Sequence, residues 1–115
     1  MSRLMEVINT DGRFISVKIS KHAEERSKER GIPEDLILNE FNLLSLRSIK
    51  TLQELPKKEI IMCNVDRDIS IVFRINGFKV FIITVMDGIS NLSNMDVSYI
   101  YVDRDGEIIS SFKGE

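Results

Sequence analysis

Two apolar segments joined by Asn76-Gly77 constrain the fold of this chain more than any other feature of its sequence. Asn-Gly is a preferred sequence for a tight β-hairpin turn, because both residues tolerate positive φ angles. The flanking residues 69–75 and 78–86 alternate so that their large apolar side chains share one face, which we expect to be the core. The reverse face carries polar residues near the turn and apolar ones farther away: Ser70, Arg74 and Lys79, then Val72, Phe81, Ile83 and Val85. A strand that is apolar on both faces is typical of the interior of a sheet, so we place residues 78–86 centrally.

Two Asp-Gly dipeptides predict a further hairpin near each end of the chain. Each dipeptide lies between segments of strand character: residues 4–9 and 13–19 around Asp11-Gly12, and residues 95–102 and 107–112 around Asp105-Gly106. A two-residue turn at the first dipeptide places Leu4 and Ile8 on the same face as Ile15. The same turn at the second dipeptide sets Arg104 opposite Glu107. The similar sequences around the two dipeptides predict one hairpin geometry used twice.

Two helices are predicted between the N-terminal hairpin and the central strands. Ser20 is a good N-cap for a helix that ends before Gly31, and Pro33 suits the first turn of the next helix. That second helix has an amphipathic stripe and should extend to about residue 46 or 49; its inward positions are Leu36, Ile37, Glu40, Phe41 and Leu44. Residues 52–58 are predicted to be a connector, residues 59–65 a strand, and residues 87–94 a loop.

Helices early in the chain and strands late in it predict an α+β fold. We expect two N-terminal-half helices packed on an antiparallel β-sheet, with an N-terminal and a C-terminal hairpin. A length of 115 residues favours a single domain covering residues 1–115.

The composition narrows the classes of function. The single cysteine, Cys63, excludes an internal disulfide and suits a reducing cytoplasm. The apolar segments are too short to span a bilayer, and the N-terminus lacks an apolar signal sequence. The sequence has neither a phosphate-binding glycine loop nor the spacing of metal ligands. We therefore expect a cytoplasmic protein that uses no metal and no cofactor.

The first predicted helix carries the candidate chemistry. His22, Arg26 and Arg30 are four residues apart and project from one face. Basic residues outnumber acidic ones between residues 13 and 30, which favours RNA or another anionic partner. Histidine is the side chain used most often for general acid–base catalysis, and arginine binds phosphate through two donors. His22 is therefore the candidate catalytic residue of a metal-independent endoribonuclease. The candidate phosphate-binding residues are Arg26, Arg30, Lys18, Arg74 and Lys79.

Each of these residues also has a structural interpretation. His22 can be a hydrogen-bonded structural residue, and the arginines can pair with Glu25, Glu29 or carboxylates on the sheet. The row either faces an open groove or belongs to a buried polar network, because the helix has almost no apolar stripe to bury. Tyr99 and Tyr101 alternate on one strand face, where they either stack on bases or pack within the sheet.

The motif His22-Ala23-x-x-Arg26-x-x-x-Arg30-Gly31-Ile32 resembles that of the DUF4258 family of bacterial and phage proteins. A strand precedes the motif, a second amphipathic helix follows it, and a later strand ends in Ile82-Ile83-Thr84-Val85. The resemblance covers roughly residues 17–86. That family is grouped with the RelE/ParE-like toxins of the barnase–EndoU–colicin–RelE superfamily. The resemblance implies a RelE-like fold and a toxin-like activity that binds or cleaves RNA.

A second class of function fits the sequence comparably well. Only one histidine is present, so the usual acid–base pair of a nuclease is missing. The acidic C-terminal third also favours a function without RNA chemistry. A non-enzymatic phage or bacterial inhibitor, or an interaction module, would instead bind a host protein or nucleoprotein. A homodimer that pairs through its last hairpin is a third alternative.

Overall fold

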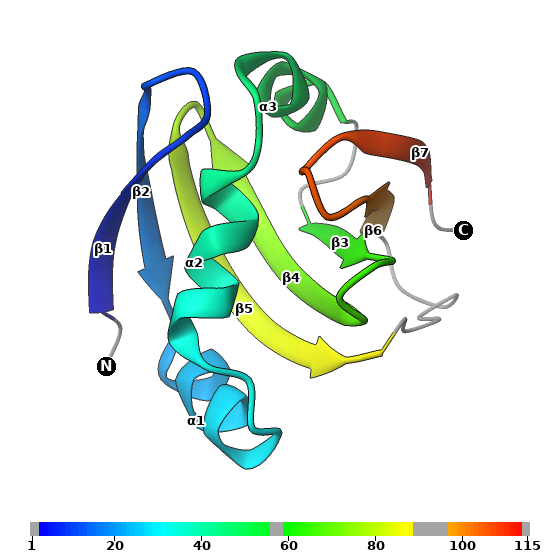
Figure 1. Ribbon diagram of the computed structural model, residues 1–115. Coiled ribbons are helices and arrows are strands. Elements are labelled where there is room, and N and C mark those ends of the chain that lie inside the picture. The colour runs from blue at the N-terminus through cyan, green and yellow to red at the C-terminus, as the bar shows by residue number, and fades with distance from the viewer. Residues whose placement is uncertain (1–2, 56–58, 89–96, 114–115) are drawn as a thin grey trace.

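The computed structural model describes residues 3–55, 59–88 and 97–113. These residues form an α+β fold in which three helices lie on one side of a seven-stranded sheet (Figure 1). The helices are α1 (Lys21–Glu29), α2 (Glu34–Asn42) and α3 (Leu46–Gln53). The strands are β1 (Arg3–Ile8), β2 (Phe14–Ile19), β3 (Glu59–Asn64), β4 (Ile69–Asn76), β5 (Lys79–Asp87), β6 (Val97–Val102) and β7 (Ile108–Lys113). The predicted loop at residues 87–94 falls mostly outside the described residues.

The sheet is mixed, so the predicted antiparallel sheet is wrong. The strand order is β1-β2-β5-β4-β3-β6-β7, in which β2 pairs parallel with β5 and β3 pairs parallel with β6. Between β2 and β5 the chain passes through the three helices, β3 and β4, and between β3 and β6 it passes through β4 and β5. Such long connections permit parallel neighbours. Both terminal hairpins are present, and β5 is an interior strand beside the central β4.

The predicted second helix is divided into α2 and α3. Ser45 starts α3 as its N-cap, because its Oγ accepts a hydrogen bond from the backbone N–H of Ser48 at 3.1 Å. The helix then continues to Gln53, into the segment predicted to be a connector. Residues 56–58 of that predicted connector lie outside the described residues.

The N-terminal hairpin has a three-residue loop instead of the predicted two-residue turn. Asn9 holds this loop, because its Oδ1 accepts hydrogen bonds from the backbone N–H groups of Asp11 at 3.1 Å and Arg13 at 2.7 Å. Gly12 follows in the left-handed conformation with φ 81°. This geometry is a standard three-residue hairpin loop with a glycine bulge.

The extra loop residue shifts the register of β1 by one and exchanges its two faces. Ile8 pairs with Phe14 instead of Ile15. Met5 and Val7 consequently pack against the core, whereas Leu4 and Ile8 are 65% and 48% exposed. The predicted placement of Leu4 and Ile8 beside Ile15 is therefore wrong.

The C-terminal hairpin repeats this loop, which confirms the predicted similarity of the two hairpins. Asp103 takes the place of Asn9, and its Oδ1 accepts from the backbone N–H groups of Asp105 at 2.9 Å and Glu107 at 3.0 Å. Arg104 lies inside the loop, and its Nε is 3.9 Å from Oδ2 of Asp66. The predicted pair of Arg104 with Glu107 is therefore wrong.

The main core lies between the helices and one face of the sheet. Phe41 of α2 meets Phe73 of β4 edge to face, with ring centroids 5.2 Å apart. The predicted core face of β4 and β5 is confirmed through Ile82, but the register shifts between Val72 and Phe73. This bulge turns Val85 to the helix side, although alternation placed it on the reverse face. Of the helices that the structure describes, none is long and apolar enough to cross a membrane.

Candidate nucleic-acid interface

The predicted first helix is confirmed as α1, and Ser20 joins its start to β5. The Ser20 Oγ accepts a hydrogen bond from the backbone N–H of Ala23 at 3.0 Å and donates one to the carbonyl of Ile83 at 3.0 Å. Gly31 ends the helix in the left-handed conformation with φ 66°. Beyond it, the N–H of Ile32 bonds to the carbonyl of Ser27 at 2.8 Å, as in a Schellman motif.

Small side chains allow α1 to pack without an apolar stripe. Ala23 is fully buried and Ser27 is 6% exposed. Ser27 satisfies its hydroxyl within the helix by donating to the carbonyl of Glu24 at 2.8 Å. The α1 backbone can therefore lie close to β5, and the remaining polar side chains stay at the surface.

The row of His22, Arg26 and Arg30 lies at the surface, not in a buried polar network. Arg26 Nη1 is 3.1 Å from Oε2 of Glu29, and Arg30 Nη1 is 3.0 Å from Oδ1 of Asp87 on β5. His22 is exposed and forms neither a hydrogen bond nor an ion pair with any described residue. Both arginines thus have carboxylate partners, and none of the described residues places a second acid–base group against His22.

The other three candidate cations lie on the sheet face opposite the helices. Lys18 of β2 is aligned with Phe81 of β5, and Phe81 is aligned with Arg74 of β4. Lys79 lies two residues before Phe81 and therefore projects from the same face. We call these four residues, Lys18, Arg74, Lys79 and Phe81, the cationic sheet face.

A groove of about 480 Å³ lies on this face. Its walls include Phe81, which is partly exposed, and the lining residues are Arg74, Ile75, Asn76, Lys79 and Phe81. Arg74 Nη2 is 3.0 Å from Oε2 of Glu59 on β3, whereas Lys18 and Lys79 form no ion pair with any described residue. The groove therefore presents an aromatic ring between Arg74 and Lys79, and Lys79 has no carboxylate partner in the described part of the chain. Lys18, which also has none there, does not line the groove but is aligned with Phe81 on the same face.

The six predicted site residues thus form two groups, three on α1 and three on the sheet. Sequence analysis placed Arg74, Lys79 and Phe81 on the reverse face of the hairpin, and the structure confirms this. Phe81 and Asn76, which line the groove, were not predicted as site residues from the sequence. The alternation of Lys79 and Phe81 along one strand face was the signal that could have identified Phe81.

Tyr99 is 3% exposed, which confirms its packing interpretation and leaves no ring face for a base. It belongs to a second apolar cluster of Ile61, Cys63, Val72, Val97 and Tyr99, with Tyr101 partly buried against it. In the part of the chain that the structure describes, no group of three or more His, Cys, Asp or Glu side chains could hold a metal.

Glu40 is a buried carboxylate that the predicted chemistry does not use. It is 3% exposed on α2, in agreement with its predicted inward position. Its Oε1 accepts a hydrogen bond from Nδ2 of Asn64 at 2.7 Å, and its Oε2 is 3.8 Å from Nε of Arg67. Burial raises the pKa of Glu40, and the Asn64 hydrogen bond and the Arg67 charge oppose this effect only in part.

Comparisons of the chain with protein-family models, with curated proteins and with solved structures give no match. Membership of the DUF4258 family and of the RelE/ParE-like superfamily stays a prediction from the α1 motif.

Proposed function

We propose that the protein binds single-stranded RNA through the cationic sheet face and does not cleave it. The observation that carries this proposal is the placement of Phe81 between Lys18, Arg74 and Lys79 on the sheet face opposite the three helices that the structure describes. Aromatic rings on an open sheet stack on unpaired bases, and neighbouring cations hold the phosphates. The groove beside Phe81 gives a splayed base a place to lie.

The same observations favour binding over cleavage. Ribonuclease chemistry without a metal needs a proton-transfer group and a phosphate held against it. Arg26 and Arg30 are engaged by Glu29 and Asp87, and His22 lies exposed without a described partner. The cations without a described carboxylate partner, Lys18 and Lys79, therefore lie on the sheet, whereas His22 lies on α1 beside two arginines that already have carboxylate partners.

Fluorescence anisotropy with a labelled single-stranded RNA of mixed sequence tests the proposal. Replacing Phe81 with Leu keeps apolar volume but removes the aromatic face. We expect an affinity loss of about 5- to 150-fold, since stacking contributes about 1–3 kcal/mol per base. The second sheet-face variant, Lys79→Ala, should also weaken binding. Its matched control is Lys50→Ala, at an exposed position of α3, which should leave the affinity unchanged. Equal affinities for the wild type and both sheet-face variants would overturn the proposal.

Cleavage is followed on a denaturing gel with the same RNA. We expect intact RNA after incubation with the wild-type protein. RNA fragments that form with the wild type and disappear with His22→Ala would show that the protein is a nuclease, and the non-catalytic part of the proposal would be wrong.

The N-terminal hairpin favours a second candidate, an interface with a host protein. Leu4, Ile8 and Phe14 are 65%, 48% and 63% exposed, and they share one face of this hairpin. Such apolar groups on a surface often mark a protein-binding site. A partner that co-purifies with the wild type and is lost with Leu4→Ser and Phe14→Ser, but retained with Ile109→Ser, would support this candidate.

A further inference from the structure

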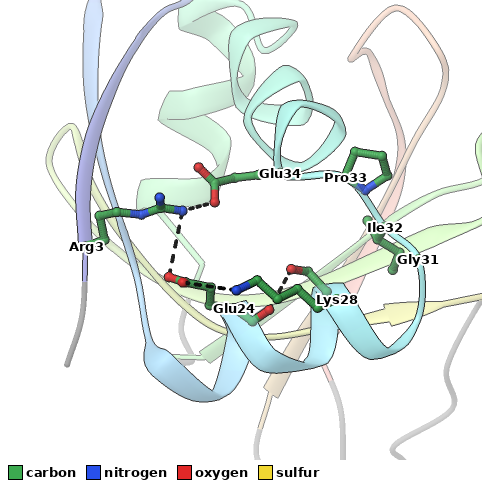
Figure 2. A pocket seen from close by; sticks show the side chains of 8 residues that line it. Arg3, Glu24, Lys28, Gly31, Ile32, Pro33 and Glu34 are labelled. Atoms are coloured by element: carbon green, nitrogen blue, oxygen red, sulfur yellow. Dashed lines mark hydrogen bonds and ion pairs between the residues drawn. The ribbon is translucent and has the colours of Figure 1, made fainter.

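A separate cavity lies where β1 begins, α1 ends and α2 begins (Figure 2). Its volume is about 420 Å³, within the size range of small-molecule pockets. Charged side chains from three elements surround the opening, and an apolar segment forms one wall. The residues used below are Arg3, Glu24, Lys28, Ile32, Pro33 and Glu34.

The charges around this cavity balance and alternate. Arg3 and Lys28 supply two positive charges, and Glu24 and Glu34 supply two negative charges. Neither a polyanion nor a simple cation matches such a ring. A small molecule with one positive and one negative group does match it, because each group finds an opposite charge.

The existing ion pairs of Glu24 are loose. Arg3 Nη2 is 3.7 Å and Lys28 Nζ is 3.9 Å from the carboxylate oxygens of Glu24, both beyond the usual length of a hydrogen bond. Arg3 is hydrogen-bonded to Glu34 instead. The Lys28 side chain is 77% exposed, and exposed ion pairs of this kind contribute little to stability. A ligand can therefore insert between Lys28 and Glu24 with little loss of stability.

We propose that this cavity binds a free α-amino acid with an apolar side chain. The ligand ammonium donates hydrogen bonds to Glu24, and its carboxylate accepts them from Lys28 and Arg3. Its side chain lies against Ile32, which is largely buried, and Pro33. This proposal is independent of RNA binding, since the cavity shares no residue with the cationic sheet face.

An NMR titration of the ¹⁵N-labelled protein with L-leucine tests the proposal. We use leucine concentrations up to about 10 mM, because an open and solvated pocket supports only weak affinity. We expect saturable shifts of the backbone amides of Glu24, Lys28, Ile32 and Glu34. N-acetylleucine, which lacks the ammonium, and leucinamide, which lacks the carboxylate, should each cause far smaller shifts.

Variants locate the site. Glu24→Gln and Lys28→Met should each weaken leucine binding at least about tenfold, the effect of losing one charged hydrogen bond. Glu25→Gln, on the exposed side of α1, is the matched control and should bind like the wild type. The proposal is wrong if leucine causes no shifts at these amides, if the two blocked compounds bind equally well, or if both cavity variants bind like the control. Leucyl-leucine binding as tightly as leucine would show that the occupant is a peptide and would overturn the assignment to a free amino acid.

Discussion

The salt dependence of RNA binding gives a quantitative test of the cationic sheet face. Each phosphate neutralised on a single strand contributes about −0.7 to the slope of log K against log salt. Lys18 and Lys79 have no described carboxylate partner, and Arg74 shares its charge with Glu59. Two full contacts and one shared contact predict a slope between about −1.4 and −2.1. The affinity should then fall about 7- to 18-fold between 50 and 200 mM salt.

The double variant Lys18→Ala/Lys79→Ala sharpens this test, because it leaves Arg74 as the only cation of the face. We expect its slope to be no steeper than about −0.7. Anisotropy titrations at four or more salt concentrations measure both slopes, and Lys50→Ala should behave like the wild type. An unchanged slope in the double variant would refute the reasoning. A slope that falls instead with Arg26→Ala would move the phosphate contacts to α1.

Three further predictions concern the fold that supports these surfaces. Burial raises the pKa of the Glu40 carboxyl above its ordinary value of 4.5, so the folded state binds the carboxyl proton more tightly than the unfolded state does. The stability that this proton contributes is present at low pH and is lost as the pH rises through the raised pKa. Urea unfolding should therefore show that Glu40→Gln gains stability over the wild type near neutral pH and loses that advantage below pH 4.5; an advantage that does not change with pH would contradict this. Gly106→Ala should destabilise the protein more than Gly12→Ala, its counterpart in the first hairpin loop. Both glycines have positive φ, which costs an alanine about 1–2 kcal/mol at either position. Only at Gly106 would the added Cβ also lie 2.6 Å from the carbonyl oxygen of Leu43. Equal unfolding free energies for the two alanine variants would contradict this prediction, because they would show that the contact with Leu43 costs nothing. Ser20→Ala should lower the unfolding free energy by about 1–2 kcal/mol, because it removes the α1 N-cap and the hydrogen bond to β5, and thermal melting that matches the wild type would contradict that role.

Local signals predicted the elements of the fold well where the determining residues are neighbours in sequence. Ser20 and Gly31 bound α1 as predicted, and the dipeptides Asp11-Gly12 and Asp105-Gly106 both lie in hairpin loops. The faces of β1 were wrong because one residue more in the loop exchanges them. That extra residue follows from the Asn9 side chain, whose two hydrogen bonds favour the longer loop.

Long-range pairing was the part that local patterns could not supply. The parallel contacts of β2 with β5 and of β3 with β6 join strands that are far apart in sequence. The candidate site shows the same limit. Alternation along one hairpin placed Arg74, Lys79 and Phe81 together, but only the pairing of β2 with β5 brings Lys18 beside them.

Mapping single-stranded RNA onto the protein by NMR tests the central claim most directly. Backbone amide shifts are recorded for the ¹⁵N-labelled protein as RNA is added. The account predicts that the largest shifts cluster on β2, β5 and β4, at Lys18, Lys79, Phe81 and Arg74, and that α3 is unaffected. Shifts confined to His22, Arg26 and Arg30 on α1, or no shifts at all, would contradict it.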